Sequence, residues 1–207
     1  MMRVLVACEY SGRVRQAFRA RGHDAWSCDL LPAEDGPCTR AYHMQGDVLA
    51  ILGQGWDLMI AHPPCTDLCN SGARWWATKA DQQAAALDFV RVLMAAPIPR
   101  IAIENPPGKI GTAIRKADQY IQPWQFGHLE TKKTGLWLKG LPKLTPTRDV
   151  HAEMMQLTLA ERSRVHWMPP GPDRWKNRSR TYQGIADAMA DQWGKPYCLP
   201  GKTSAQS

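Results

Sequence analysis

Short apolar runs alternate with stretches of helical spacing over the first part of the chain. Four runs have the aliphatic composition of buried parallel strands, namely Arg3–Cys8, Ala25–Asp29, Trp56–Ala61 and Arg100–Ile103. Helices are predicted over Val14–Ala20 and, most clearly, over Asp81–Ala95, where Ala85, Phe89, Val92 and Leu93 share one face. This alternation predicts an α/β, Rossmann-like fold with a parallel sheet covered by helices on both faces.

The pattern changes after residue 122. Gln122–Pro142 is predicted to form short β structure, and Ile185–Trp193 has the spacing of a closing helix. The segment between them is rich in Pro, Arg and Trp and predicts loops around one short helix near 157–165. We therefore divide the chain into a core (1–122), a small basic region (123–181), a helix that returns to the core (182–198) and a tail (199–207).

Composition excludes several classes of protein. With 207 residues, 44% hydrophobic and 22% charged, the chain is long enough to bury a core. No apolar run approaches the roughly 20 residues of a membrane span, and the first residues do not form a signal peptide. Six cysteines are too few for a disulfide scaffold. We expect a cytoplasmic protein of a bacterial host cell, with reduced thiols.

The positive charge is concentrated in two segments. The chain carries 26 Lys and Arg against 19 Asp and Glu, and residues 1–129 are close to neutral. Residues 130–143 and 162–180 account for the excess, and the second also contains Trp167 and Trp175. Basic side chains interleaved with aromatic ones suit a nucleic-acid backbone, although a solvated basic loop gives the same pattern.

A thiol and a carboxylate are predicted at one edge of the sheet. Cys65 lies in the turn His62-Pro63-Pro64-Cys65 after one predicted strand, and Glu104 follows another. In parallel sheets, ligands bind beyond the carboxyl ends of the strands. Attack on a pyrimidine needs such a pair, since a thiolate adds to C6 of the ring while a carboxyl group near the exocyclic amine and N3 stabilises the charge that develops.

Here the chain resembles the DNA cytosine-C5 methyltransferase family, in a short form associated with phage and prophage genes. The resemblance covers most of residues 3–194, with the landmarks in the family's linear order. It implies that Cys65 is the nucleophile and that Glu104 supports N3. S-adenosyl-L-methionine (AdoMet) would be the methyl donor, with S-adenosyl-L-homocysteine as the product. The target base would leave the DNA duplex.

The resemblance also implies a cofactor site. The segment Val6–Gly12 stands where the family's glycine-rich turn meets the methionine portion of AdoMet, Asp29 matches the acid on the ribose, and Asp47 matches the residue beside the adenine amine. The residues assigned to cofactor binding in this way are Glu9, Tyr10, Ser11, Gly12, Asp29, Asp47, Pro63, Gly184, Ile185 and Ala186.

The sequence departs from the family pattern in three places. The N-terminal turn has a single glycine, Gly12. The family's Gln-x-Arg-x-Arg signature is missing, and Lys132 and Lys133 stand near the expected position as candidate catalytic residues. The recognition region is small, which makes a homodimer or a partner subunit attractive. Candidate DNA contacts are Arg74, Arg174, Lys176, Arg178 and Arg180.

Other functions compete with this one. The same attack on C6 would serve an enzyme that modifies free dCMP, but such an enzyme needs few positive charges. A DNA-binding protein that kept the fold and lost catalysis would contain Cys65 as an ordinary buried thiol. A zinc site at His62, Cys65 and Cys69 is disfavoured because the ligand spacing is wrong and no second pair of ligands follows, so we expect no metal.

Overall fold

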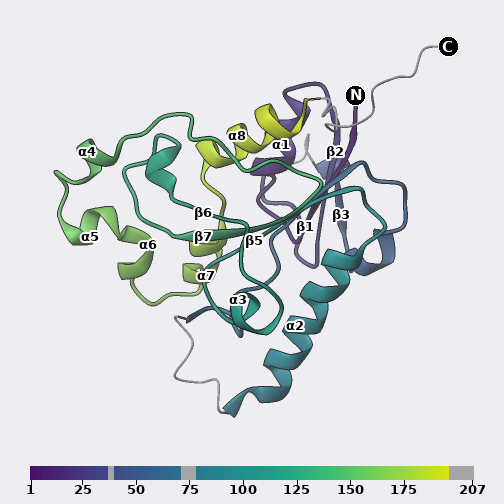
Figure 1. Cartoon of the computed structure of the whole chain (residues 1–207), viewed down its shortest axis with the longest axis horizontal. Coiled ribbons are helices and arrows are strands. Elements are labelled where there is room, and N and C mark those ends of the chain that lie inside the picture. Colours follow the sequence, from purple (N-terminus) through teal and green to yellow (C-terminus); the bar gives the residue numbers. More distant parts are fainter. Residues whose placement is uncertain (37–39, 71–77, 196–207) are drawn as a thin grey trace.

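One seven-stranded sheet organises the chain in the order β3-β2-β1-β4-β5-β7-β6 (Figure 1). The computed structural model describes residues 1–36, 40–70 and 78–195. The strands are β1 (Arg3–Ala7), β2 (Asp24–Asp29), β3 (His43–Gln45), β4 (Leu58–Ala61), β5 (Arg100–Asn105), β6 (Gln119–Ile121) and β7 (Thr134–Lys139). The pairs from β3 to β5 are parallel, whereas β7 runs antiparallel to both of its neighbours.

Helices connect the strands and extend the chain beyond β7. They are α1 (Arg13–Arg19), α2 (Ala80–Ala95), α3 (Lys109–Ala113), α4 (His151–Met154), α5 (Leu159–Arg162), α6 (Arg164–Trp167), α7 (Arg174–Ser179) and α8 (Gln183–Trp193). Short 3₁₀ helices lie at Arg40–Tyr42, Val48–Ile51 and Pro123–Gln125.

Two apolar layers cover the two faces of the sheet. Alternate residues of β1 point to opposite faces, so that Val4 and Val6 join one layer and Leu5 and Ala7 the other. The first layer is completed by α1 and α8, which lie side by side in Figure 1. The second layer is completed by α2. The Rossmann-like α/β fold expected from the sequence is confirmed.

The direction in which strands are added reverses between β1 and β4. From β1 the chain adds β2 and β3 on one side, then returns and adds β4 and β5 on the other. Crevices form outside the carboxyl ends of strands where the order reverses in this way, because the two connections leave in opposite directions. This topology fixes the place of the candidate site.

Two sequence expectations are wrong in detail. The buried residues of α2 are Leu87, Val90 and Leu93, whereas Ala85 and Val92 are exposed. The apolar side chains of this helix are spread over more than one face, so spacing alone did not identify the buried one. Residues 144–180 do not form one short helix near 157–165, because four short helices, α4 to α7, lie there.

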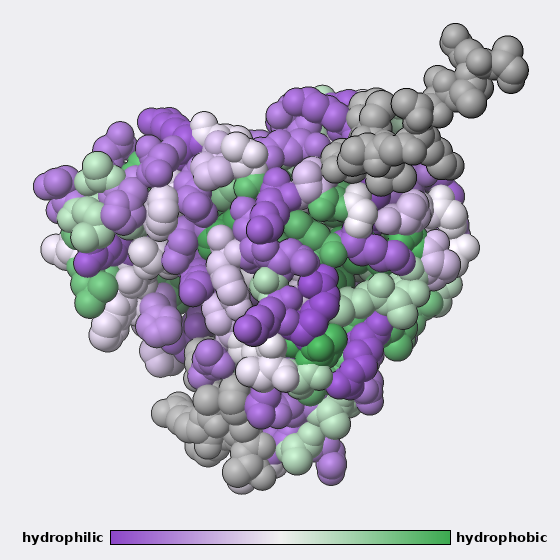
Figure 2. Space-filling view, in the orientation of Figure 1, coloured by the Kyte–Doolittle hydropathy of each residue, from purple (hydrophilic) through white to green (hydrophobic). Residues whose placement is uncertain are grey.

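The segment after β6 is partly integrated into the sheet. It contributes β7, which pairs with β5 through Ile101–Lys139 to Asn105–Gly135. Beyond β7, α4 to α6 extend to one side of the molecule (Figure 1). Figure 2 shows apolar side chains at the surface where Figure 1 places α4 and α5, and Met155 and Leu159 are indeed exposed there. Among the described helices, none combines the length and apolar character needed to cross a membrane.

Candidate active site

The register of three parallel strands sets the site. Ala7 of β1 pairs with Ala61 of β4, and Ala61 pairs with Ile103 of β5. One residue further, His62 and Glu104 therefore stand side by side at the edge of the sheet. The backbone N–H of His62 still donates to the carbonyl of Ala7 at 2.9 Å, which keeps β4 in register up to this point.

A cleft of about 100 Å³ opens beyond these strand ends. Its walls come from the segment after β1, the turn after β4, the end of β5 and two segments further along the chain. The lining residues are Cys8, Glu9, Tyr10, Ser11, His62, Pro63, Pro64, Cys65, Glu104, Asn105, Pro106, Lys132, Arg178, Ser179, Arg180 and Thr181. The structure thus brings Cys65, Glu104 and Lys132 together, as the sequence predicted for a common site.

His62 and Glu104 form a buried pair. The Nδ1 atom of His62 lies 2.6 Å from Oε2 of Glu104, and each side chain is 11% exposed. Burial by itself lowers the pKa of His62, but the hydrogen bond and charge of Glu104, with the charge of Glu9, raise it above the ordinary value. For Glu104, burial raises the pKa, but the contact with His62 outweighs it and lowers the pKa. The raised pKa of His62 and the lowered pKa of Glu104 together indicate an imidazolium–carboxylate pair.

Two further contacts fix the end of β5. The side chain of Thr181 hydrogen-bonds Glu104 and helps to lower its pKa. The amide of Asn105, which is buried, donates to the carbonyl of Pro63 at 2.8 Å. This bond ties the end of β5 to the turn that carries Cys65.

The thiol of Cys65 is held in a tight turn. Its carbonyl accepts from the backbone N–H of Leu68 at 3.1 Å and of Cys69 at 2.9 Å. A hydrogen bond with the Cys69 thiol and burial raise the pKa of Cys65, and Lys132 opposes this shift. In this conformation Cys65 is therefore a protonated thiol and not an activated thiolate.

Gly108 allows the loop after Cys65 to approach the end of β5. The backbone N–H of Lys109 donates to the carbonyl of Leu68 at 2.8 Å, and Asn70 donates to the carbonyl of Pro107 at 3.1 Å. A Cβ atom at Gly108 would lie 2.0 Å from the carbonyl oxygen of Leu68. The absence of a side chain at this position is thus a condition for the shape of the turn.

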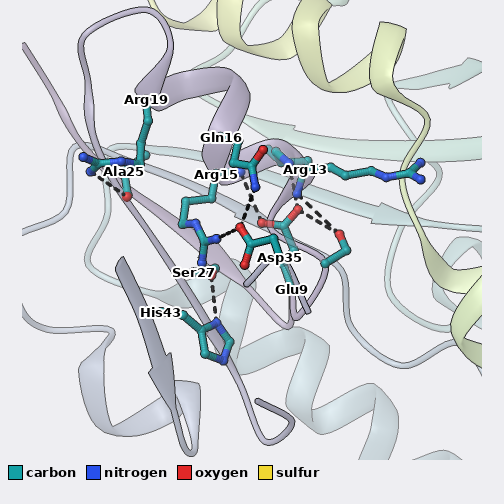
Figure 3. Close-up of polar contacts among 11 residues, drawn as sticks. Glu9, Arg13, Arg15, Gln16, Arg19, Ala25, Ser27, Asp35 and His43 are labelled. Atoms are coloured by element: carbon teal, nitrogen blue, oxygen red, sulfur yellow. Dashed lines mark hydrogen bonds and ion pairs between the residues drawn. The ribbon is translucent and has the colours of Figure 1, made fainter. Parts of the chain in front are cut away.

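Glu9 turns inward from the end of β1. Cys8 has a φ of 58°, in the left-handed region that non-glycine residues seldom adopt, and this bend directs the next residue under α1. The Glu9 carboxylate accepts from the backbone N–H of Val14 at 2.7 Å and of Arg15 at 3.2 Å (Figure 3). It therefore provides acceptors for two N–H groups in the first turn of α1, which have no partner within the helix. Burial raises the pKa of this carboxyl group.

A second polar network supports this turn. The buried Arg15 forms an ion pair with Asp35 and donates to the hydroxyl of Ser27 at 2.7 Å (Figure 3). Ser27 in turn contacts Nδ1 of His43 at 2.9 Å. Gly12 lies against Asp35 in the left-handed conformation, with a φ of 72°. The network anchors the loop around Gly12 to β2 and β3.

Asp29 and Asp47 face the same strand end as Cys8. Burial, then the charges of Asp29, Cys28 and Asp47, raise the pKa of Cys8 to about 12, which places both carboxylates near that thiol. Asp29 accepts from the backbone N–H of Leu31 at 2.9 Å. Asp47 accepts from Leu49 at 2.9 Å, which caps a 3₁₀ helix.

This donor set fits the nucleoside part of AdoMet. A carboxylate at the end of β2 and one directly before Val48 can accept hydrogen bonds from ribose hydroxyls and from an adenine amine. The cleft itself is below the range of about 300–1,000 Å³ for drug-sized ligands, and its size suits one pyrimidine ring.

The side chains of the two candidate lysines, Lys132 and Lys133, lie in different places. Lys132 lines the cleft, and its Nζ atom lies 3.5 Å from the carbonyl oxygen of Arg180. Lys133 instead places its Nζ atom 4.6 Å from the centroid of the Tyr120 ring. The alternation of side chains leading into β7 explains why neighbouring lysines point in different directions.

The basic segment 174–181 crosses one side of the cleft. The hydroxyl of Tyr10 contacts the carbonyl oxygen of Lys176 and the hydroxyl of Ser179, each at 2.9 Å. Arg13 donates to the carbonyl of Thr181 at 2.9 Å. Arg180 forms an ion pair with Glu34. These contacts attach the segment to the loops after β1 and β2.

The candidate DNA contacts therefore differ in surroundings. Arg180 is paired with Glu34, and the Nε atom of Arg174 donates to the carbonyl of Met168 at 2.7 Å. Lys176 lies 3.7 Å from Asp173. Arg178 lines the cleft. Arg74 lies outside the described residues.

The returning helix does not line the cleft. Ile185 and Ala186 are buried in the apolar layer between α8 and α1, because α8 begins at Gln183 and turns them inward. The backbone N–H of Gly184 donates to Nε2 of His128 at 2.9 Å. Within residues 1–36, 40–70 and 78–195, no group of three His, Cys, Asp or Glu side chains could hold a metal ion.

Sequence reasoning missed His62 and Thr181 as site residues. His62 was considered only as a metal ligand, although its position directly after a strand, level with Glu104, was a usable signal. Thr181 had no such signal, since it reaches Glu104 through a fold contact between residues far apart in the sequence.

The fold and the cleft define an α/β protein with a polar, thiol-containing cleft at the carboxyl ends of the strands, where the strand order reverses. No protein-family model and no curated protein matches the sequence. One similar solved structure is a chain from E. coli, provisionally described as a DNA modification methyltransferase encoded within a prophage. The identity is 16% and the TM-score 0.47, with 67% of this chain and 46% of that chain covered. The chain thus spans about half the length of that protein.

The close approach at Gly108 predicts a local effect of substitution. Gly108→Ala should displace Leu68 and the turn that carries Cys65, and lower the free energy of unfolding by about 1–3 kcal/mol. Gly111→Ala in α3 is the matched control, because a Cβ there meets only the Tyr120 hydroxyl at 4.0 Å. Denaturant unfolding and mass-spectrometric mapping of Cys65 alkylation would measure both effects. Equal stability and equal alkylation in the two variants would contradict this account of the turn.

The buried pair predicts a dependence of stability on pH. The raised pKa of His62 contributes stability that is complete below its ordinary value of 6.5 and is lost as pH rises through the folded-state pKa. The lowered pKa of Glu104 contributes stability above 4.5 that is lost as pH falls. His62→Gln should therefore destabilise the protein more at about pH 5.5 than at about pH 9. Urea unfolding at both values measures this difference, and a pH-independent difference would argue against the charged pair.

Proposed function

We propose that this protein is an AdoMet-dependent DNA (cytosine-5)-methyltransferase. The observation that carries the proposal is the convergence of Cys65, Glu104 and Lys132 in one cleft at the carboxyl ends of β4 and β5. A thiol, a carboxylate and a cation are the groups that addition to C6 of a cytosine requires. The size of the cleft suits a single base that has left the duplex.

Each group has a defined part in this reaction. Cys65 as a thiolate would form a bond to C6 of cytosine, and the ring would then carry negative charge from C5 to N3. The anionic ring would be stabilised by the cationic groups of the cleft wall, of which Lys132 is one. Asn105 would act indirectly, because its hydrogen bond to Pro63 holds the turn of the nucleophile.

AdoMet, when bound, would supply the methyl group that C5 receives. Asp29 and Asp47 would hold its ribose and adenine, and the segment from Glu9 to Gly12 with Pro63 would lie beside its methionine portion. Glu9 would act mainly by shaping this turn, because its carboxylate already accepts two backbone N–H groups of α1.

The basic segment beside the cleft supports DNA as the substrate. Residues 174–180 contribute four basic side chains, and Trp175 is 51% exposed among them. Cations next to the opening would contact phosphates on either side of an extruded base. Free dCMP would need fewer of them.

The raised pKa of Cys65 favours a second candidate, a DNA-binding protein that has lost catalysis. An unactivated thiol beside Cys69 is what such a protein would contain. The two candidates differ in one event, namely the formation of a bond between Cys65 and the base.

A mechanism-based substrate tests this event. With AdoMet and a duplex in which 5-fluorocytosine replaces cytosine, the protein should become covalently attached, because fluorine cannot leave C5 as a proton does. Denaturing electrophoresis and peptide mass spectrometry should locate the bond at Cys65. Cys65→Ala should form no adduct, whereas Cys69→Ser should still form one.

The outcomes separate the candidates. No adduct with retained DNA binding would support the catalytically inactive protein. No adduct and no DNA binding, together with methylation of dCMP, would support the enzyme acting on free nucleotides. An adduct on Cys69 alone would contradict the assignment of the nucleophile.

The proposed DNA surface predicts a change in salt dependence. Arg178→Ala should reduce the slope of log K against log salt concentration for duplex binding by about 0.9, because one phosphate contact is lost. Arg91→Ala on α2 removes an exposed arginine that does not line the cleft and should leave the slope unchanged. Fluorescence anisotropy at several salt concentrations measures both slopes. The same slope for Arg178→Ala and the wild type would place the DNA elsewhere.

A further inference from the structure

The Nε2 atom of His62 is an unexplained polar atom in the cleft wall. His62 lines the cleft, and its Nε2 is buried without a hydrogen-bond partner in the part of the chain that the structure describes. A buried polar nitrogen without a partner costs free energy unless a ligand or a water completes its hydrogen bond. Its position therefore indicates a contact that forms when the cleft is occupied.

The Glu104 carboxylate is in the opposite situation. Its Oε2 atom lies 2.6 Å from Nδ1 of His62, and the side chain also accepts from Thr181. These contacts stabilise the carboxylate and keep it unprotonated. Glu104 is thus suited to accept hydrogen bonds, and it has no proton to give to a ring nitrogen.

We propose that His62, oriented by Glu104, is the residue that donates a hydrogen bond and a proton from Nε2 to N3 of the cytosine in the cleft. Glu104 is then a positioning residue that holds the ring of His62 through Nδ1. This inference rests on the proposed function, since it names a proton donor for the same reaction.

The charged groups around His62 favour its protonated form. Glu104 of β5 and Glu9 after β1 face it with negative charge, and Lys132 opposes them. The other titratable groups of the cleft are Cys8, Tyr10, Cys65, Arg178 and Arg180. In the imidazolium form both ring nitrogens are donors, so that Nδ1 donates a hydrogen bond to Glu104 while Nε2 donates one to the base.

The proton transfer balances the addition step. The Cys65 thiol first releases its proton to solvent water. The resulting thiolate forms the S–C6 bond, and the electron pair of the C5=C6 bond moves toward C4 and N3. N3 takes the proton from Nε2, so that the N–H bond of the imidazolium breaks and an N3–H bond forms. His62 becomes neutral and still donates from Nδ1 to Glu104. After C5 has received the methyl group, water takes the C5 proton, the C5=C6 bond re-forms as the S–C6 bond breaks, and the proton on N3 returns to Nε2.

A pair of variants separates the two nitrogens of His62. In His62→Asn the amide replaces the Nδ1 edge of the ring, so the contact with Glu104 is kept and the donor toward the base is lost. In His62→Gln the amide reaches toward the position of Nε2 instead. With the 5-fluorocytosine duplex, we expect adduct formation about 100-fold or more slower in His62→Asn, and partly restored in His62→Gln. A purely structural role in supporting Glu104 predicts the reverse order.

Two further measurements distinguish donation from support. The rate of adduct formation by the wild type should decrease at alkaline pH, because His62 loses its proton there. This decrease should be missing in His62→Asn. Wild-type protein should also bind a duplex containing 3-deazacytosine, which lacks N3, about 10-fold more weakly than one containing cytosine. This comparison needs no variant, so it remains informative if a substitution at His62 prevents folding.

Each outcome decides between the inference and the function on which it rests. An adduct with an unchanged rate in His62→Asn, or equal binding of cytosine and 3-deazacytosine by the wild type, would overturn the role of His62 and leave the methyltransferase intact. No adduct with the wild type would overturn both. A slow His62→Asn variant, restored by His62→Gln, together with discrimination against 3-deazacytosine, would support the proton donor.

Discussion

The parallel register of β1, β4 and β5 is the constraint on which the site depends. Because Ala7, Ala61 and Ile103 are aligned, the residues that follow them lie at the same level near the edge of the sheet. Acidic and basic side chains thus meet where the strand order reverses and where no further strand can cover them. A shift of one residue in β4 would turn His62 to the other face and separate it from Glu104.

The site is held by contacts that belong to different parts of the chain. Asn105 restrains the turn of Cys65 through Pro63, and the hydroxyl of Tyr10 holds the basic segment at Ser179. The opposing charges on both sides of the cleft have a physical role as well. They surround the buried ion pair of His62 and Glu104 with further polar partners, which lowers the cost of burying the two charges.

The sequence predicted what depends on local pattern and missed what depends on tertiary contact. Apolar runs identified β1, β2, β4 and β5, because parallel strands that are buried on both faces consist almost entirely of apolar residues. The convergence of Cys65 and Glu104 followed from the rule that strand ends share an edge. The sequence did not show which of Lys132 and Lys133 faces the cleft, because that depends on where the chain enters β7. It also did not show that Ile185 is buried away from the cleft, because that depends on packing against α1. The raised pKa of the Cys65 thiol also depends on a tertiary contact, namely its hydrogen bond with Cys69.

The raised pKa of Cys65 and the charged His62 are linked by the cleft they share. In the proposed reaction, a thiol that is protonated at rest would need an adjacent positive charge before it could attack. Binding of a base would exclude water and bring Lys132 and His62 onto the same ligand. An imidazolium that donates to the base would offset the negative charge that the thiolate brings into the ring. Activation of the thiol would then be coupled to occupation of the cleft, and the thiol would stay unreactive until a base is present.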